Sequence, residues 1–312
     1  MARKPRLHIP GALYHVILRG NAQEDIFFDQ QDRFAFYDLL AEGVHRFGYR
    51  VHAFCLMTNH VHLALQAGDE SLSRGMQNLG FRYTSHVNAA RKRVGHLFEG
   101  RYKAFLVDQD SYGLELVRYL HLNPVRSGMV SDAADYPWSA HRAYLGREAL
   151  AWLTTDWVLG QFGSSLGVAR RRYARFVADG TGQGHRDDLY GGEHDSRVVG
   201  EEDFVARSVL AEAGRPRPPS LAALVRVVCK DSALTPAQLS APGRTRAPAR
   251  ARAALAWLGV RAGAATLVEI AAMTGRDAST LSHGMAALAA EAERDPETKV
   301  WLEKLLNAVM QA

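Results

Sequence analysis

The chain has 312 residues, of which 47% are hydrophobic and 23% charged, and its formal net charge is +5 with a pI of about 9.3. This length allows two domains with their own cores, and the mild basic excess permits a nucleic-acid partner without requiring one. Cys55 and Cys229 stand far apart without metal-binding spacing, which excludes a disulfide framework and a cysteine zinc site. No apolar run is long enough for a signal peptide or a membrane span, so we expect no membrane partner.

The first half of the chain alternates between strand and helix patterns. Runs of β-branched and aromatic residues indicate strands, and apolar residues at helical spacing indicate helices. A tight turn is expected at Thr58 and Asn59. The last helix is expected to end before Pro124, because the residue preceding a proline avoids the helical conformation. In chain order, strand, helix, strand, strand, helix, strand and helix are expected at 11–20, 32–48, 49–57, 60–66, 71–93, 103–107 and 111–123.

This order of elements predicts an α+β domain. A succession of strand, helix, two strands, helix and strand favours a ferredoxin-like antiparallel sheet with helices on one face. We place this domain at residues 1–145. Residues 146–200 are expected to form an accessory helical segment and a linker, since residues 179–196 are rich in glycine and charge. Alanine and leucine dominate residues 201–312, which predicts an all-α domain.

One expected strand carries two histidines within an apolar run. Because strand side chains alternate between faces, His60 and His62 share one face. Val61, Leu63 and Leu65 then take the opposite face and enter the core. Two parallel imidazoles suit one divalent ion and leave coordination positions open, as a catalytic metal requires. The alternative is a pair of half-buried structural histidines, which is the commoner outcome for an isolated His-x-His pair.

The helix at 111–123 carries a candidate nucleophile. Tyr119 lies mid-helix, and Asn123 is four residues later on the same helical face, where its carbonyl oxygen is a candidate third ligand. A tyrosine phenol becomes a useful nucleophile when a metal polarises the phosphate it attacks. Tyr112 is the rival nucleophile, but position 116 is leucine and offers no equivalent of Asn123. The alternative for Tyr119 is simple packing in the core.

Six motifs occur in one order over roughly residues 5 to 145. They are YHVILRGN, IFFDQQDR, FCLMTNHVHLAL, HLFEGRYKAFLVD, RYLHLNPVRSGMV and DYPWSAHR. Together they resemble the REP-associated tyrosine transposases, which are single-strand DNA transposases with a His-hydrophobic-His motif. The resemblance implies the HUH nuclease fold for residues 1–145.

The resemblance also assigns roles to the residues singled out above. It implies that His60 and His62 bind Mg²⁺ or Mn²⁺ and that Asn123 completes the ligand set. Tyr119 would attack a DNA phosphate and form a 5′-phosphotyrosine link, leaving a free 3′-OH for strand transfer or resealing. Relatives from classical insertion sequences often carry glutamine where this chain has asparagine, so the resemblance supports the role of Asn123 less than those of the histidines.

Basic residues cluster in two stretches. Residues 74–103 hold seven Lys and Arg with one acid, and residues 215–276 hold ten with two acids. Such stretches can face phosphates, although a solvated helix surface is an equally good explanation. Aromatic side chains in a basic region can stack on unpaired bases, or they can pack in the core. The candidates for DNA contact in the first domain are Arg101, Lys103, Arg118, Arg126 and Tyr83.

The C-terminal region predicts a helix-turn-helix motif over residues 266–288. Gly275 allows the turn, and Asp277 or Ser279 can cap the second helix. From about residue 220 to 290 the sequence resembles the DNA-binding domain of the replication initiator DnaA, but Ala278 replaces a histidine of that family's signature. A helical packing module without DNA binding is the alternative. Candidate contacts to the major groove are Arg276, Ser279, Thr280 and His283.

The histidine pair and Tyr119, together with the resemblance, predict a metal-dependent transposase and endonuclease. The resemblance implies that it cleaves and rejoins single-stranded DNA beside REP-type hairpins, and the C-terminal domain makes duplex DNA a second expected partner. We expect it to act on the nucleoid in the bacterial cytoplasm, as a monomer or a homodimer. The alternatives are a domesticated, non-catalytic DNA-binding regulator and a related nuclease that nicks DNA without rejoining it.

Overall fold

The computed structural model describes residues 6–192, 194–213, 219–243 and 245–310. The chain divides into two compact units, Met1–Gly214 and Arg215–Ala312. The first unit is the α+β domain, and it includes the segment 146–200 that was expected to be an accessory region and linker. In the described part of the chain, no helix combines the length and the apolar character needed to cross a bilayer.

The first unit is built on one five-stranded sheet with the order β2-β3-β1-β4-β5. The pairs β2–β3, β3–β1 and β1–β4 are antiparallel, which is the ferredoxin-like arrangement predicted from the element order. The fifth strand was not predicted, and it pairs with β4 in parallel, so the sheet is mixed. The strands are β1 Leu13–Arg19, β2 Arg50–Leu56, β3 His60–Gln66, β4 Lys103–Val107 and β5 Val198–Val199.

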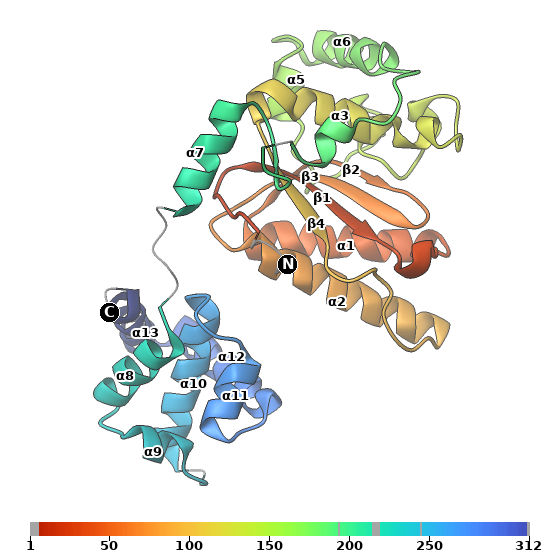
Figure 1. Ribbon diagram of the computed structural model, residues 1–312. Helices are drawn as coiled ribbons and strands as arrows, with labels where there is room; N and C mark the ends of the chain where they lie inside the picture. Colours follow the sequence, from red (N-terminus) through yellow and green to blue (C-terminus); the bar gives the residue numbers. More distant parts are fainter. Residues whose placement is uncertain (1–5, 193, 214–218, 244, 311–312) are drawn as a thin grey trace. The chain divides into compact units, whose positions relative to one another are not determined.

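Two helices cover one face of this sheet. Helices α1 (Gln30–Phe47) and α2 (Leu72–Arg91) lie side by side beneath it (Figure 1). Asp29 caps α1 by accepting a hydrogen bond from the Asp32 amide, and Gly48 ends it in the left-handed conformation at φ 66°. The strand residues facing these helices are apolar, because Leu18 and Val61 are register partners, as are Val16 and Leu63. This layer forms the main core.

The opposite face carries helices as well, which corrects the prediction of helices on one face only. Helix α3 (Gln109–Arg126) contacts β1, β2 and β3 on the histidine side of the sheet (Figure 1). It runs past Pro124, although we expected it to end there. A proline in the last helical turn removes one backbone hydrogen bond, and the Ser127 amide still bonds to the Asn123 carbonyl.

The rest of the first unit packs around α3. The glycine-rich stretch predicted to be a linker instead folds against the sheet, where it forms the short helix η3 and the strand β5. Glycine and charge favour loops, but here Leu189 is fully buried and anchors the stretch to the core. The remaining elements of this unit are η1 Asn21–Gln23, η2 Ala133–Asp135, α4 His141–Tyr144, α5 Asp156–Gly160, α6 Leu166–Ala178, η3 Asp187–Tyr190 and α7 Glu202–Ala213.

The second unit is all-helical, as predicted. Its core contains fully buried leucines from α8 and α10 together with Ile270 of α11. Gly275 lies between α11 and α12 at φ 62°, in the left-handed conformation that the turn requires. Asp277 is the residue before α12, without a capping side-chain bond. The helices are α8 Leu221–Asp231, α9 Pro236–Ser240, α10 Arg246–Arg261, α11 Leu267–Thr274, α12 Ala278–Arg294 and α13 Pro296–Met310.

Candidate active site

Both candidate histidine ligands lie on the face of the sheet that α3 covers. His62 pairs in register with Ile17 of β1, and His60 pairs with Arg19 at the end of the strand. The ring centroids of His60 and His62 are 5.0 Å apart, with the ring planes nearly perpendicular. His62 is buried and His60 is half-buried. The predicted common face is therefore present, and one histidine lies deep while the other lies nearer to solvent.

A third histidine supports His62 from the neighbouring strand. His15 Nδ1 lies 2.9 Å from the Leu189 carbonyl oxygen, which can only accept, so Nδ1 carries the proton. Burial lowers the pKa of His15 to about 4, so the ring is neutral at pH 7 and its Nε2 is an acceptor. That Nε2 lies 2.8 Å from His62 Nδ1, so His62 Nδ1 donates. The chain of bonds leaves the lone pair of His62 on Nε2.

His60 is held in the same tautomer by a different neighbour. Its Nδ1 lies 2.7 Å from the Asn59 Oδ1 atom, an acceptor, so His60 donates through Nδ1 and keeps its lone pair on Nε2. Burial lowers the pKa of His60 to about 4, and it also lowers the pKa of His62. Neither Nε2 atom has a hydrogen-bond partner within the described ranges. Neutral imidazoles with open Nε2 lone pairs are the form that binds metals.

The candidate nucleophile faces these histidines from α3. Tyr119 is 4% exposed, and its ring centroid lies 6.4 Å from that of His62, edge to face. The Arg126 guanidinium lies over the Tyr119 ring, 4.0 Å from its centroid, and donates to the Tyr119 backbone carbonyl. The phenol oxygen of Tyr119 lies 2.9 Å from Tyr190 Oη and 3.1 Å from His185 Nδ1. The structure thus brings Tyr119, the histidine pair and Arg126 together.

Asn123 is joined to this cluster through Arg126. Its Oδ1 accepts from Arg126 Nη2 at 2.7 Å, and its Nδ2 is buried without a partner among the described atoms. A carbonyl oxygen has two lone pairs, so one remains for a cation. Within the described residues no group of three His, Cys, Asp or Glu side chains could hold a metal, so a site here needs the amide oxygen. Two imidazoles and an amide fit Mn²⁺ better than Mg²⁺, which prefers an all-oxygen shell.

The chain matches a known family over this region. Residues 9–123 match the family model described as "Transposase IS200 like". The matched residues all lie within the first compact unit and include β1, β2, β3 and the histidine pair. A solved structure of a REP-associated tyrosine transposase bound to a REP hairpin is also similar, with 16% sequence identity and a TM-score of 0.41, over 49% of this chain and 92% of that one. No curated protein matches the chain.

Two of the five predicted DNA contacts in the first unit, Tyr83 and Arg118, are unavailable to DNA in the structure. Tyr83 is fully buried against Phe27 and Phe36, and its hydroxyl donates to the Ile26 carbonyl, so it cannot stack on bases. Its position on the apolar face of an amphipathic helix decides this outcome. Arg118 pairs with the Glu115 carboxylate and lies over the Phe176 ring. These contacts within the fold occupy its guanidinium in place of a DNA phosphate.

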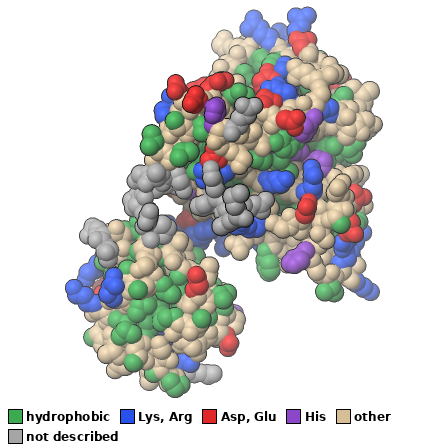
Figure 2. Space-filling view, in the orientation of Figure 1, with side chains coloured by type: hydrophobic (Ala, Val, Ile, Leu, Met, Phe, Trp, Pro, Cys, Tyr) green, Lys and Arg blue, Asp and Glu red, His purple; other side chains and the backbone are tan. Residues whose placement is uncertain are grey.

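Of the other three predicted contacts, Arg126 lies half-buried over the Tyr119 ring, and Arg101 and Lys103 remain exposed. Arg101 and Lys103 lie before and at the start of β4 with exposed side chains, and Arg101 lines a cavity of about 620 Å³. The same cavity is lined by Phe81, which is 71% exposed, and by Tyr102, whose ring lies under the Arg6 guanidinium. Figure 2 also shows Lys and Arg side chains over α6, at the top of this unit.

The predicted contacts in the second unit lie at one end of one helix. Ser279, Thr280 and His283 are exposed near the start of α12, and the His283 Nδ1 bonds to the Ser279 carbonyl. Arg276 lies in the preceding turn, where its guanidinium donates to the carbonyls of Ala241 and Gly243. These four residues therefore share the start of α12, and Arg276 also ties the turn to the segment after α9.

Three residues of the site were missed by sequence reasoning. His15 lies within the first motif, and only the strand register shows that its ring meets His62. His185 and Tyr190 lie in the stretch expected to be a linker, and no local pattern indicates that they reach Tyr119. A stretch rich in glycine and charge indicates a linker, but it does not indicate long-range contacts. Tyr119 is 66 residues from His185 and 71 residues from Tyr190 in the sequence.

Proposed function

We propose that this protein is a single-strand DNA transposase that cleaves and rejoins DNA through a covalent link to Tyr119. The observation that carries the proposal is the contact between Tyr119 and the face of the sheet that presents His60 and His62 with open Nε2 atoms. The family match over residues 9–123 supports transposase chemistry in this unit. We also propose that the protein acts on the bacterial nucleoid.

The residues around Tyr119 are suited to form and hold a phenolate. Arg126 places positive charge over the Tyr119 ring, next to the side chain that would carry negative charge as it attacks. His60, His62 and Asn123 would hold a divalent ion, whose charge would polarise the scissile phosphate. The Tyr119 oxygen would attack phosphorus as the P–O3′ bond breaks, which conserves one phosphodiester and makes resealing possible.

The substrate we propose is a DNA hairpin with a single-stranded flank, of the REP type that the six sequence motifs indicate. The cavity beside Arg101 combines basic side chains with the exposed ring of Phe81, which is the chemistry that binds an unpaired strand. The exposed start of α12 would hold duplex DNA in the second unit. Both assignments are part of the proposal.

The test is a covalent-capture assay with hairpin oligonucleotides that carry randomised single-stranded flanks. Wild type, Tyr119→Phe and Tyr112→Phe would be incubated with Mn²⁺ or with EDTA and separated on a denaturing gel. Tyr112 is a matched control, because it lies on the same helix and its hydroxyl contacts Glu201 rather than the histidine cluster. We expect a protein–DNA adduct with wild type and Tyr112→Phe in Mn²⁺, and none with Tyr119→Phe or EDTA.

Firm binding of the hairpins without any adduct would overturn the proposal. The protein would then be a DNA-binding regulator that retains the transposase fold. An adduct that persists in Tyr119→Phe would instead move the nucleophile to another tyrosine. Religation of the captured strand to an added 3′-OH end separates a transposase from an enzyme that only nicks.

A further inference from the structure

The Tyr119 hydroxyl is in contact with two polar side chains from a segment far along the chain. His185 Nδ1 lies 3.1 Å from the Tyr119 oxygen, and Tyr190 Oη lies 2.9 Å from it. On its other side, His185 Nε2 lies 3.3 Å from Asp187 Oδ1. A nucleophile, an imidazole and a carboxylate are thus arranged in a row, which is the order that activates hydroxyl nucleophiles.

The directions of these hydrogen bonds follow from the carboxylate. Asp187 can only accept, so a neutral His185 carries its proton on Nε2 and presents the Nδ1 lone pair to Tyr119. Tyr119 then donates its proton to His185. Tyr190 must donate to the Tyr119 oxygen, because that hydroxyl has only one proton to give. Burial raises the pKa of Tyr190, so its phenol stays protonated and remains a donor.

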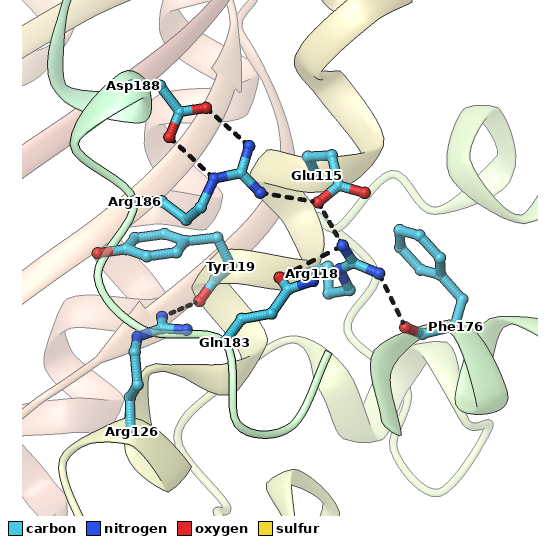
Figure 3. A network of polar contacts seen from close by, with 8 residues as sticks. All are labelled: Glu115, Arg118, Tyr119, Arg126, Phe176, Gln183, Arg186 and Asp188. Atoms are coloured by element: carbon cyan, nitrogen blue, oxygen red, sulfur yellow. Dashed lines mark hydrogen bonds and ion pairs between the residues drawn. The ribbon is translucent and has the colours of Figure 1, made fainter. Parts of the chain in front are cut away.

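The segment that carries His185 is fastened to α3. Arg186 pairs with Asp188 at 2.7 Å and with Glu115 of α3 at 3.1 Å, and Arg118 of α3 reaches Gln183 (Figure 3). Tyr119 lies beside these contacts on the same helix (Figure 3). The contacts on both sides of position 185 fix the imidazole next to the nucleophile, while the His185 side chain stays 56% exposed and can exchange protons with water.

We propose that His185 is the general base that activates Tyr119 and that Tyr190 stabilises the phenolate. This inference rests on the proposed role of Tyr119 as the nucleophile. In cleavage, the Tyr119 proton passes to His185 Nδ1, the Tyr119 oxygen forms a bond to phosphorus, and the P–O3′ bond breaks. The departing 3′ oxygen takes a proton from water. No atom is oxidised or reduced in this step, and water is the only other reactant.

The same residue serves the reverse reaction. When a 3′-OH attacks the phosphotyrosine, the 3′ oxygen gives its proton to water and forms a bond to phosphorus. The bond between phosphorus and the Tyr119 oxygen breaks, and protonated His185 returns a proton to that oxygen. A base in one direction must be an acid in the other. Cleavage therefore needs neutral His185 and rejoining needs its protonated form, so low pH slows cleavage and high pH slows rejoining.

The groups around His185 come from two parts of the unit. Tyr119 faces it from α3, and Arg126 lies over the Tyr119 ring. Asp187 and Tyr190 face it from its own segment. The nearby charged side chains Glu115, Arg118, Arg186 and Asp188 are paired with one another.

The test compares rates of adduct formation and of rejoining across pH for wild type, His185→Ala, Tyr190→Phe and Asp187→Asn. The substrates are the randomised-flank hairpins that wild type links to Tyr119. We expect His185→Ala to slow cleavage by about 10²- to 10⁴-fold and to lose the acid limb of the cleavage profile. Added imidazole should restore part of that rate. Tyr190→Phe should cost about 10²-fold, as loss of one oxyanion donor does. Asp187→Asn should cost only a few-fold, because Asp187 is 97% exposed.

The control is His45→Ala, an exposed histidine near the end of α1 on the opposite side of the sheet, which should leave both profiles unchanged. A His185→Ala rate within two-fold of wild type, or one that falls without imidazole rescue or a change of pH profile, would overturn the base assignment. A faster rate in His185→Ala would show that the segment shields Tyr119. The Tyr119→Phe variant tests the proposed function separately. If this variant forms no adduct, Tyr119 is the nucleophile, whatever the result for His185→Ala.

Discussion

The two faces of the central sheet are made by the same strands and differ in almost every physical property. On the α1 and α2 side, β3 presents Val61, Leu63 and Leu65, all fully buried among apolar neighbours. On the α3 side, the same strand presents His60 and His62, whose Nδ1 atoms are held by hydrogen bonds. The apolar face stabilises the fold by burial alone, whereas the two histidines can be buried only because each of their Nδ1–H groups finds an acceptor.

A polar site can lie inside the core of this unit because its hydrogen bonds are satisfied within the fold. His62 donates a hydrogen bond to His15, and His15 donates to the backbone carbonyl of Leu189. The acceptor is supplied by a segment that is remote in sequence. A site of this kind therefore depends on the complete fold, while the apolar face depends only on the alternation of residues along each strand.

The largest expected effect on stability comes from a truncation on the apolar face of the sheet, next to the site. Leu63→Ala removes a fully buried side chain, and we expect the free energy of unfolding to fall by about 2–5 kcal/mol. The neighbouring change His60→Ala removes a half-buried ring and one hydrogen bond, so it should cost about 1 kcal/mol or less. Urea unfolding of both variants measures this contrast.

The same pair should behave in the opposite way toward Mn²⁺. His60→Ala removes a proposed ligand, so we expect Mn²⁺ affinity to fall by more than about 100-fold, beyond the cost of losing a mere supporting partner. Folded Leu63→Ala should retain the affinity of wild type, measured by electron paramagnetic resonance of free Mn²⁺. Equal losses of Mn²⁺ affinity in the two variants would contradict the assignment of metal binding to the polar face alone.

Acid should lower the free energy of unfolding through a second group of buried imidazoles, which includes His121 of α3. Burial lowers the pKa of His141 from 6.5 to about 4, and it also lowers that of the neighbouring His121. The unfolded chain then binds more protons than the folded chain between pH 6.5 and 4, so this part of the stability is present above pH 6.5 and is lost as the pH falls.

For His141 alone this loss amounts to up to about 3 kcal/mol. We expect the urea midpoint of wild type to fall between pH 6.5 and 4, and the fall to be smaller in His141→Phe. The exposed His45 provides the matched control, since His45→Phe should leave the slope unchanged. A slope that His141→Phe does not alter would mean that other groups cause the acid sensitivity.

Local sequence patterns were enough to predict the residues on the apolar face of the sheet and part of those on the polar face. The alternation in β3 placed His60 and His62 on one face, and the order of elements predicted the four antiparallel strands. Helical spacing placed Tyr119 and Asn123 on one helix. The fifth strand, His15 and the 183–190 segment could not be predicted, because their positions depend on strand register and on long-range packing that no local pattern encodes. Tyr83 was assigned to DNA although its helix buries it.

A smaller effect should separate a ligand from the residue that orients it. His15→Phe keeps an aromatic ring of similar size beside Phe105 but removes the acceptor for His62 Nδ1. His62 is then free to move its proton to Nε2, the atom proposed to bind metal. We expect Mn²⁺ affinity to fall by about 10- to 100-fold, as for other supporting partners of metal-binding histidines.

The matched control for His15→Phe is His52→Phe. His52 is also a buried strand histidine with two hydrogen-bond partners, Gln66 and the Thr154 carbonyl, and neither partner belongs to the proposed metal site. Its substitution should lower stability to a similar degree and leave Mn²⁺ affinity unchanged. Equal affinity losses in both variants would assign the effect to general destabilisation and remove the orienting role of His15.

The smallest expected effect lies at the edge of the polar face, where the 183–190 segment is fastened. Arg186→Gln removes the ion pairs to Glu115 and Asp188, which are partly exposed and should contribute no more than about 1 kcal/mol to stability. Global unfolding should therefore change little. Hydrogen exchange in residues 183–190 should nevertheless become faster, because the segment loses its tie to α3 while Leu189 keeps it in the core. If exchange there stays as slow as in wild type, the buried leucine alone positions the segment, and the ion pairs drawn in Figure 3 are incidental to it.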